Sequence, residues 1–506
     1  MTVLEQLAVY AQSARTALIS REENLTFRRL EEKSNAFASW LLENLGDDRS
    51  PVVICGDKET DFLCCIFGAL KSGRAYVPID SVVPDERAGQ IIESVNPKVI
   101  IDFTGRELYC SAKVLDSGET AEILNLPPSE PVPRKCWVSG DDTVYILFTS
   151  GSTGRPKGVP ITVQNLEAFC QGVFPFYPQD GGVILHQVSY SFDVSGCSVY
   201  AGLSRGMTLF TVDHKMSADF GELFSQLRES GLTMWVSTPS FAELCIQSKS
   251  FSKEFLPELK QFLFCGESLT CTLCSGLSER FPSAQILNTY GPTEATVLVT
   301  AAEITPEMCS GSQPVPIGSP IDGVVLKLAD PSGQEILEEG KTGQLLILGE
   351  SVSAGYFGQQ LLTKKSFFTD RETGLRGYRT GDLCYRKDNL YYYCGRADNQ
   401  LKLNGYRIEL EDVEANLEKI PNIQRAAAVP VMEGEKVQYL AAFLLLREPD
   451  GMTPLRRSIY LKKQAAAYLP AYMIPRRLFA VDRFPLNVNG KIDKKALAAR
   501  LMEGRI

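Results

Sequence analysis

The sequence predicts an α/β protein with a large N-terminal domain of layered β-sheets and helices and a small α+β C-terminal domain. Short β-branched runs alternate with amphipathic stretches through the first hundred positions, a pattern typical of βαβ units and a largely parallel sheet. The charge balance then changes near Asp398. Residues 399–506 hold 18 Lys and Arg against 12 Asp and Glu, whereas residues 1–398 carry a net charge of −15. We therefore expect domains at 1–397 and 398–506.

The elements of the large domain follow from this alternation. The predicted strands are VVICG from Val52, AYVPID from Ala75 and VIIDF from Val99, and the predicted helices between them cover 60–71 and 84–95. Each apolar run is too short for a helix and each intervening stretch has helical periodicity. A similar alternation continues to about Gly349, so we expect the same plan to extend over most of this domain.

The elements of the small domain differ in kind. A predicted helix presents one apolar face made of Leu410, Val413, Leu417 and Ile420. Two predicted strands cover 426–431 and 437–446, and a turn at Asn489-Gly490 precedes a short basic helix. One helix face followed by consecutive strands indicates an α+β unit.

Composition excludes several classes of protein. With 44% hydrophobic and 22% charged residues among 506, the chain is an ordinary globular protein. Its net charge of −9 argues against a nucleic-acid partner. The longest apolar run, residues 437–446, is about half as long as a helix that crosses a bilayer. We expect no integral membrane segment, no secretory signal and a cytoplasmic location.

Cysteine and histidine are poor guides to a metal centre here. The chain has 14 cysteines, most of them inside apolar runs, which indicates small buried hydrophobes. The CxxC at Cys271 and Cys274 has no second pair at zinc spacing, and His186 and His214 are the only histidines. We expect no structural zinc and no His-based triad, although His186 stays open as a general base.

A glycine- and hydroxyl-rich loop is the sharpest local signal. The predicted strand 144–148 runs directly into TSGSTGRPKG. Small residues let backbone N–H groups approach a ligand closely, hydroxyls add donors, and a lysine adds charge, so the loop suits a polyphosphate. It is not a Walker A loop, because Lys157 follows Pro156 and precedes Gly158. Its candidate phosphate-binding residues are Thr149, Ser150, Gly151, Ser152, Thr153, Gly154 and Lys157.

This loop resembles the signature of the adenylate-forming superfamily, which includes acyl-CoA synthetases, luciferases and the amino-acid adenylation enzymes of peptide synthetases. Further matching motifs follow in order and cover nearly the whole chain: SFDVS around Asp193, FCGESL around Cys265, NTYGPTEATV from Asn288, GYRTGD ending at Asp382, YCGRADNQLKLNGYRIEL from Tyr393, and NGKIDKKAL around Lys491.

The resemblance implies a site for ATP and Mg²⁺. Tyr290 would stack on adenine, Asp382 would accept the ribose hydroxyls, and Glu294 with Thr153 would hold magnesium, which takes few protein oxygens. Besides the glycine-rich loop, the implied ATP-binding residues are Asn288, Thr289, Tyr290, Gly291, Pro292, Thr293, Asp382, Tyr393, Cys394, Gly395, Arg396 and Lys491.

The resemblance also implies an amino-acid site. The aspartate of FDxS separates amino-acid activators from other members, and a carboxylate about 4 Å from an α-ammonium contributes on the order of 4 kcal/mol at an effective dielectric near 20. Asp193 is this candidate, with capping of a helix from Ser195 as the alternative role. The implied pocket walls contain no aromatic or charged residue: Val194, Cys197, Ser237, Leu263, Cys265, Thr289, Val297 and Leu298. They suit a small apolar side chain.

FCGESL, YGPTEATV, YLPAYMIPRR and NGKIDKKAL resemble the stand-alone D-alanine:carrier-protein ligases of teichoic-acid D-alanylation. In that group the residue matching Cys265 abuts the alanine methyl, and Val297 and Lys491 contact the substrate. Cys197 replaces a larger residue expected there, which leaves the pocket size open.

This resemblance implies two steps, D-alanyl-AMP formation and transfer to the phosphopantetheine thiol of a carrier protein. Lys491, 15 residues before the end of the sequence, would serve adenylation, and we expect the carrier in trans. Asp398 matches the hinge of the mobile C-terminal lid. Two alternatives stay open: activation of another small amino acid for non-ribosomal peptide synthesis, and a non-catalytic nucleotide or amino-acid sensor.

Overall fold

The computed structural model describes residues 2–21, 23–108, 110–127, 130–151, 154–179, 181–309, 313–398, 400–403, 405–433, 436–485 and 492–502. The chain forms two compact units. The larger unit comprises Met1–Ser81, Val95–Leu147 and Gly158–Ala397, and the smaller comprises Val82–Ser94, Phe148–Lys157 and Asp398–Ile506. The predicted α/β class is confirmed, while the division into domains at 1–397 and 398–506 stays a prediction.

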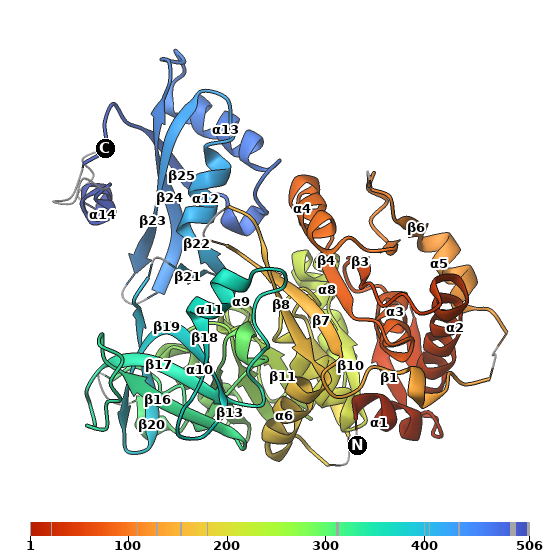
Figure 1. Ribbon diagram of the computed structural model, residues 1–506. Coiled ribbons are helices and arrows are strands. Elements are labelled where there is room, and N and C mark those ends of the chain that lie inside the picture. The colour runs from red at the N-terminus through yellow and green to blue at the C-terminus, as the bar shows by residue number, and fades with distance from the viewer. Residues whose placement is uncertain are drawn as a thin grey trace. The chain divides into compact units, whose positions relative to one another are not determined.

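A nine-stranded sheet forms one layer of the larger unit (Figure 1). Its strands, in spatial order, are β15 (Ser319–Pro320), β14 (Thr300–Glu303), β13 (Gln285–Tyr290), β12 (Gln261–Phe264), β11 (Met234–Ser237), β9 (Gly182–His186), β10 (Met207–Thr211), β1 (Thr16–Ile19) and β2 (Asn24–Thr26). Neighbours from β13 to β1 run parallel, whereas β14, β15 and β2 are antiparallel additions at the edges.

A six-stranded sheet contains the predicted βαβ units. Its strands, in spatial order, are β6 (Lys113–Asp116), β5 (Val99–Asp102), β3 (Val52–Gly56), β4 (Tyr76–Asp80), β7 (Thr143–Thr149) and β8 (Lys157–Thr162). The strands β6, β5, β3, β4 and β7 are parallel, as the alternation predicts. The connections α3 (Thr60–Lys71) and α4 (Asp85–Val95) also match their predicted ranges, and α4 groups with the smaller unit.

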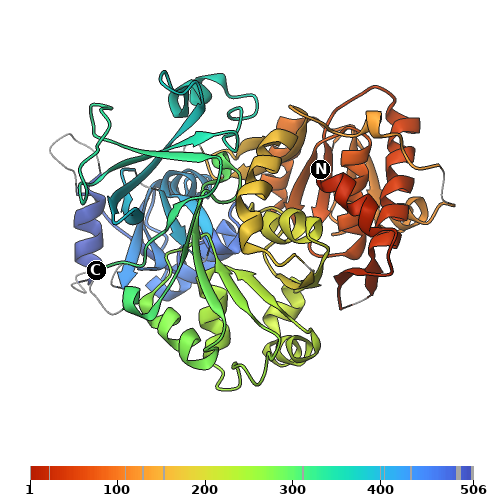
Figure 2. The same cartoon turned by 90° about the horizontal axis from the view of Figure 1, so that it is seen from below.

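The remaining helices of the larger unit pack around its sheets (Figure 2). They are α1 (Val3–Tyr10), α2 (Phe27–Leu45), α5 (Ser117–Leu124), α6 (Val163–Val173), α7 (His214–Ala218), α8 (Phe220–Glu229), α9 (Pro239–Ile246), α10 (Cys271–Arg280) and α11 (Gln360–Ser366). The helices α2 and α3 pack closely at Gly68, which has no side chain. A Cβ there would lie 2.7 Å from the ring of Phe37.

A third sheet departs from the expected alternation. The strands β16 (Val324–Ala329), β17 (Gly343–Gly349), β18 (Phe367–Thr369), β19 (Arg376–Lys387) and β20 (Leu390–Arg396) pair antiparallel. The β19–β20 turn contains Asp388 and Asn389 at φ of 51° and 62°, the left-handed conformations that a two-residue hairpin requires. The prediction that strand–helix alternation continues to about Gly349 is wrong for its last part, because β16 and β17 follow β15 with no α-helix between them.

Cysteines contribute to the hydrophobic core, as their placement in apolar runs predicts. Cys55, Cys64, Cys65 and Cys170 are buried, and every cysteine in the described residues is a free thiol. Burial raises the pKa of the Cys55 thiol to about 12, so this group is protonated and apolar at neutral pH. Cys110 and Cys394, by contrast, are exposed.

The smaller unit builds its own core around a three-stranded sheet. Its elements are the hairpin β21 (Gln400–Leu403) and β22 (Tyr406–Glu409), the sheet strands β23 (Ile423–Glu433), β24 (Lys436–Leu446) and β25 (Arg477–Ala480), and the helices α12 (Leu410–Leu417), α13 (Pro454–Ala465) and α14 (Lys494–Met502). Leu410, Val413, Leu417 and Ile420, the predicted apolar face, are all buried. The Asn489-Gly490 turn lies outside the described residues.

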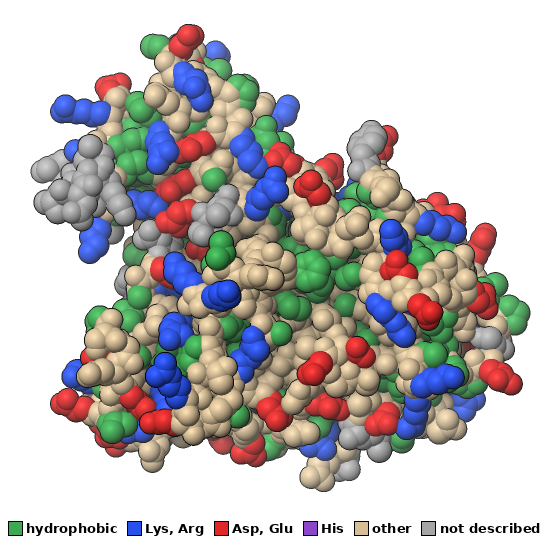
Figure 3. Space-filling view, in the orientation of Figure 1, with side chains coloured by type: hydrophobic (Ala, Val, Ile, Leu, Met, Phe, Trp, Pro, Cys, Tyr) green, Lys and Arg blue, Asp and Glu red, His purple; other side chains and the backbone are tan. Residues whose placement is uncertain are grey.

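On the face seen in Figure 3, basic and acidic side chains are interspersed. Within the described ranges, no helix combines the length and apolar character that crossing a bilayer requires.

Candidate active site

The end of β13 and the loop after it are fixed by buried hydrogen bonds. Asn288 Nδ2 donates to Pro316 O at 2.8 Å, and Thr289 Oγ1 donates to Phe264 O at 2.8 Å. The next turn needs a residue without a side chain, because a Cβ on Gly291 would lie 2.4 Å from Leu298 Cα. Asn288 and Thr289 therefore hold the backbone of this loop through their side chains.

Tyr290, Asp382 and Arg396 form one buried constellation in the larger unit. The Tyr290 hydroxyl donates to Asp382 Oδ2, and Arg396 Nη1 donates to Asp382 Oδ1 at 2.6 Å. Asp382 and Arg396 face each other because β19 and β20 pair in that register. Burial raises the pKa of Tyr290 well above its usual value, so the phenol remains a donor. The motifs quoted from the sequence thus converge on one carboxylate.

Thr380 supports this constellation and was not anticipated from the sequence. Its hydroxyl accepts a hydrogen bond from the Asp382 N–H at 2.9 Å, and its carbonyl accepts one from Arg396 Nη2 at 3.1 Å. Thr380 lies two residues before Asp382 in the GYRTGD motif. This nearness to Asp382 was the only sign in the sequence that Thr380 belongs to the site.

Asp193 lies half-buried before a short π-helical segment, Cys197–Gly202. Its Oδ2 accepts a hydrogen bond from Thr293 Oγ1 at 2.7 Å. The alternative role, capping of a helix from Ser195, stays a prediction, since helical residues do begin at Ser195. Through Thr293 the carboxylate is oriented toward the loop that carries the nucleotide motif.

The predicted side-chain walls are all buried, and they are closely packed. A Cβ on Gly196 would lie 3.0 Å from Val297 Cγ2. Burial and the neighbouring Cys265 thiol raise the pKa of Cys197 well above its usual value. Ser237 differs from the expectation in one respect: its hydroxyl accepts from Trp235 Nε1 and donates to Thr238 O, at 2.8 and 2.7 Å, within its own strand and turn.

Two β-branched residues beside this wall adopt left-handed backbone conformations. Thr296 has a φ of 61° and Val297 a φ of 70°. Such a conformation costs a β-branched residue of order 1–3 kcal/mol and persists where the surroundings enforce it. The Thr296 hydroxyl donates to Ser351 O at 2.6 Å, and Val297 is fully buried. The backbone is therefore strained at Thr296 and Val297, where the nucleotide motif joins the predicted pocket walls.

Glu294 is fully buried and accepts a hydrogen bond from the Tyr356 hydroxyl at 2.8 Å. Tyr356 also lies 3.4 Å from the Tyr378 hydroxyl. Neither tyrosine was identified from the sequence. A buried carboxylate whose orientation is fixed by a phenol has the donor chemistry that Mg²⁺ prefers.

The glycine-rich loop is described in part, and it groups with the smaller unit. Ser152, Thr153 and Lys491 lie outside the described residues. A Cβ on Gly151 would lie 2.2 Å from Arg155 O, so the loop requires glycine there. Within the described part of the chain, the buried Thr149 hydroxyl finds no hydrogen-bond partner. An orphaned donor beside a tight glycine turn fits a nucleotide phosphate.

Ser150 and Lys157 bind β22. Ser150 Oγ donates to Arg407 O at 2.8 Å, and Lys157 Nζ lies 3.4 Å from Glu409 Oε1. Burial raises the pKa of Glu409, while Lys157 and Arg407 oppose that rise. Lys157 was predicted to bind phosphate, and no protein partner was predicted for it, so the contact with Glu409 is new.

The last predicted segment lies on β20 and just beyond it. Cys394 is exposed, Gly395 has a φ of 112°, and Tyr393 is half-buried. Asp398 is the first residue of the smaller unit's C-terminal segment, and its Oδ1 accepts from the Gln400 N–H at 3.1 Å.

Two family models match the chain in succession. The model of AMP-binding enzymes matches residues 5–357, and the model of the AMP-binding enzyme C-terminal domain matches residues 412–491. The chain belongs to the AMP-binding enzyme family. The resemblance drawn from the motifs is thereby confirmed, and the chain is a ligase-type enzyme of that family.

Curated relatives of this AMP-binding enzyme match over its whole length. A Bacillus licheniformis protein named "D-alanine--D-alanyl carrier protein ligase" is 36% identical over 500 residues, covering 98% of this chain and 99% of the relative. A Bacillus anthracis protein of the same name is 37% identical over 504 residues, covering 99% and 100%.

Solved structures share the fold of this AMP-binding enzyme. A Vibrio cholerae adenylation domain, AlmE, in complex with glycyl-adenosine-5'-phosphate matches with a TM-score of 0.84 at 22% identity, covering 99% of this chain and 97% of that chain. An artificially fused adenylation-PCP di-domain from Klebsiella oxytoca matches with a TM-score of 0.83 at 24% identity, covering 94% and 93%.

Proposed function

We propose that this AMP-binding enzyme activates D-alanine with ATP and passes the D-alanyl group to the phosphopantetheine thiol of a separate carrier protein, feeding D-alanylation of teichoic acid. The full-length relatives named D-alanine--D-alanyl carrier protein ligase support the substrate and the acceptor. One observation in the site carries the proposal. Asp193, oriented by Thr293, lies beside the walls of the predicted pocket, which are built of small or aliphatic side chains.

Asp193 binds the α-ammonium of the amino acid in this proposal. The Thr293 hydroxyl donates to Oδ2, and an ionised carboxylate has about four lone-pair sites, so an incoming ammonium can still donate to it. Because the carboxylate is half-buried, the attraction is stronger than in water and weaker than in a dry interior. The position of Asp193 therefore selects a substrate with a free α-amino group.

Asp382 receives the ribose of ATP in the same way. Arg396 and Tyr290 orient its two oxygens and balance its charge before any ligand arrives. Each oxygen keeps a further lone pair for a ribose hydroxyl. Thr149, Gly151 and Lys157 would face the phosphates. Glu294 and Thr153 would hold Mg²⁺, which supplies positive charge against the phosphate oxygens.

The proposed reaction has two steps, adenylation of D-alanine and transfer of the D-alanyl group to a thiol. A carboxylate oxygen of D-alanine attacks the α-phosphorus of ATP, the bond to the β-phosphate breaks, and pyrophosphate leaves. The pantetheine sulfur, having lost its proton, then attacks the acyl carbon, and AMP leaves with the electron pair of the C–O bond. Lys491 would bridge the substrate carboxylate and the α-phosphate in the first step, where negative charge moves toward pyrophosphate. We expect both steps in the cytoplasm, where ATP is available.

Enantiomer choice follows from the walls of the pocket in this proposal. Cys265 and Cys197 are neighbouring buried thiols, and Val297 closely approaches Gly196. In this proposal the pocket accepts a methyl group, and the Cys265 thiol would meet the side chain of the opposite enantiomer. Replacing Cys265 with Gly should therefore relax the preference for D-alanine without abolishing activation.

The decisive experiment is ATP–pyrophosphate exchange with D-alanine, L-alanine, glycine and D-serine, using the wild type and Cys265→Gly. We expect D-alanine to be preferred by the wild type and the preference over L-alanine to shrink in the variant. Equal exchange with both alanine enantiomers by the wild type would refute the D-alanine assignment. Exchange with glycine alone would favour activation of another small amino acid, and no exchange would favour a sensor. Loading of a purified phosphopantetheinylated carrier with D-[14C]alanine tests the second step.

A further inference from the structure

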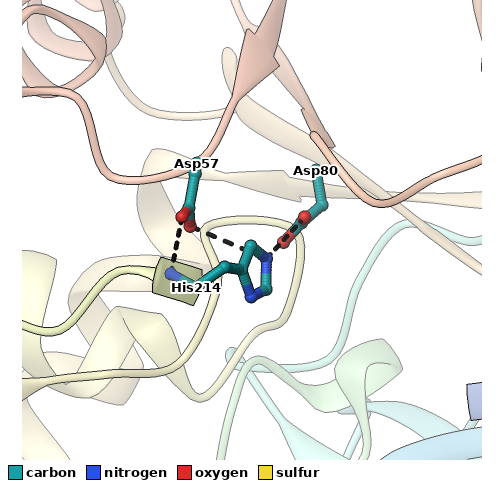
Figure 4. A group of neighbouring side chains, drawn as sticks. All are labelled: Asp57, Asp80 and His214. Carbon is teal, nitrogen blue, oxygen red and sulfur yellow. Dashed lines mark hydrogen bonds and ion pairs between the residues drawn. The ribbon is translucent and has the colours of Figure 1, made fainter. Parts of the chain in front are cut away.

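A second polar cluster lies in the larger unit, outside the residues used above. Asp57 directly follows β3, Asp80 ends β4, and His214 begins α7, three residues after β10. β3 and β4 are neighbours in the six-stranded sheet, whereas β10 belongs to the nine-stranded sheet. All three strands end at the cluster, and Figure 4 shows the three side chains pointing toward one another. The cluster therefore joins the carboxyl ends of strands from two different sheets.

The donor atoms have the spacing of metal ligands. His214 Nε2 lies 2.9 Å from Asp80 Oδ1 and 3.7 Å from Asp57 Oδ1. One ligand atom from each residue lies within 4.8 Å of the others, and within the described ranges no other group of three His, Cys, Asp or Glu residues meets this condition. A tetrahedral ion with ligand bonds of about 2.1 Å separates its ligand atoms by roughly 3.4 Å. The two distances from His214 Nε2, 2.9 and 3.7 Å, lie on either side of that value.

The ligands are held in place by the backbone around them. The His214 N–H donates to Asp57 Oδ2 at 2.7 Å, which leaves Oδ1 directed at the imidazole. Asp213 caps α7 by accepting a hydrogen bond from the Met216 N–H at 2.6 Å. This cap fixes the backbone of His214, the first residue of α7. The Asp80 side chain is 4% exposed, whereas that of His214 is 40% exposed. Asp80 thus lies on the buried side of the cluster, and an ion could reach the cluster from the solvent on the side of His214.

Lys58 is a buried cation near the cluster, and the charges of Asp57 and Asp80 act on it. Its Nζ lies 2.9 Å from His186 Nε2 and donates to Val188 O, and it stacks over the Tyr190 ring. An ion at the cluster would therefore have the Lys58 side chain as a neighbouring charge, held by contacts with His186, Val188 and Tyr190. Without an ion, Asp57, Asp80 and His214 would form a hydrogen-bonded cluster only.

We propose that Asp57, Asp80 and His214 bind one divalent transition-metal ion of the Zn²⁺, Co²⁺ and Mn²⁺ class, which ties the ends of the two sheets together. Two carboxylate oxygens and one imidazole nitrogen suit this class better than Ca²⁺, which takes oxygen ligands, or Cu⁺, which prefers sulfur. The ion is separate from the Mg²⁺ proposed at Glu294, and no redox step is involved. Its role is structural.

The test uses the full-length chain, stripped of metal and kept reduced, without nucleotide. Titration with CoCl₂, followed by calorimetry and visible absorption, should give one ion per chain with ligand-field bands and a higher melting temperature. His214→Gln and Asp57→Asn should each lower the affinity by at least about tenfold and remove the bands. Glu229→Gln, which removes one exposed carboxylate from α8, is the charge-matched control and should bind as the wild type does. Circular dichroism establishes that each variant is folded.

Four results would overturn the proposal. Wild-type protein that binds no Co²⁺ would leave a hydrogen-bonded cluster only. Unchanged binding by folded His214→Gln and Asp57→Asn would place the ion elsewhere. Thiolate-to-cobalt charge-transfer absorption would place it on cysteines, and loss of binding in Glu294→Gln alone would place it at the nucleotide site. Because no amino acid or ATP is present, these results are independent of whether D-alanine is the substrate.

Discussion

Replacing Asp193 with Asn tests the amino-acid end of the site. The amide is nearly isosteric and its oxygen can still accept from Thr293, so the change removes the charge and little else. A full charge at about 4 Å and an effective dielectric near 20 is worth on the order of 4 kcal/mol. Because Asp193 is only half-buried, we reduce this to about 2–3 kcal/mol. The KM for D-alanine in pyrophosphate exchange should therefore rise roughly 30- to 150-fold, while binding of a fluorescent ATP analogue stays near the wild-type value.

Two further variants separate the charge of Asp193 from its position. Thr293→Val removes the 2.7 Å hydrogen bond but keeps the charge, and should raise the same KM by about tenfold, the value of one hydrogen bond to a charged group. Asp322→Asn removes an exposed carboxylate of the larger unit and should change neither constant. An unchanged KM in Asp193→Asn, or a larger effect of Thr293→Val than of Asp193→Asn, would refute the assignment of the ammonium to Asp193.

Three other outcomes are expected. Asp382→Asn should raise the KM for ATP by about tenfold or more, because it weakens both the Arg396 pair and the proposed ribose contact; an effect confined to the KM for D-alanine would contradict this. Lys491→Ala should suppress formation of D-alanyl-AMP yet spare carrier loading from pre-made D-alanyl-AMP; equal slowing of both half-reactions would argue against a lysine that serves one step. Hydrogen bonding to Asp80 raises the pKa of His214, so its stabilising contribution is complete below the unfolded pKa of about 6.5 and is lost as pH rises through the folded value. In urea unfolding with a chelator, His214→Gln should therefore destabilise the protein more at pH 6 than at pH 8.5, and a difference that grows toward high pH would contradict the assignment.

Local patterns predicted the parallel part of the fold well. The strand at Val52 and the helix at 60–71 have the predicted bounds, because apolar run length and helical periodicity act within one segment. The antiparallel β19–β20 hairpin could not be read in this way. Its turn depends on Asp388 and Asn389 adopting left-handed conformations. Asp and Asn tolerate this conformation better than most residues, but they also occur in many other kinds of turn, so the pair alone does not specify a hairpin.

The sequence motifs identified the candidate site residues but not the residues that form hydrogen bonds with them. Asp382 and Tyr290 were selected separately, yet their hydrogen bond joins residues 92 positions apart. Tyr356 and Glu409, the partners of Glu294 and Lys157, stand outside the glycine-rich and NTYGPTE motifs. Contacts of this kind depend on the packing of distant segments, which one sequence does not reveal.

The left-handed pair Thr296 and Val297 has a consequence for directed evolution. Glycine or asparagine adopts this backbone more easily than a β-branched residue, so Thr296→Gly should relieve strain of order 1 kcal/mol while removing the hydroxyl bonded to Ser351. Val297 would then be held less firmly against Gly196. Libraries screened for thermal tolerance and libraries screened for discrimination between alanine enantiomers should diverge at these two positions, which deep sequencing of both pools would detect. Substitutions at these two adjacent positions should therefore increase thermal stability at the expense of enantiomer selectivity, or the reverse.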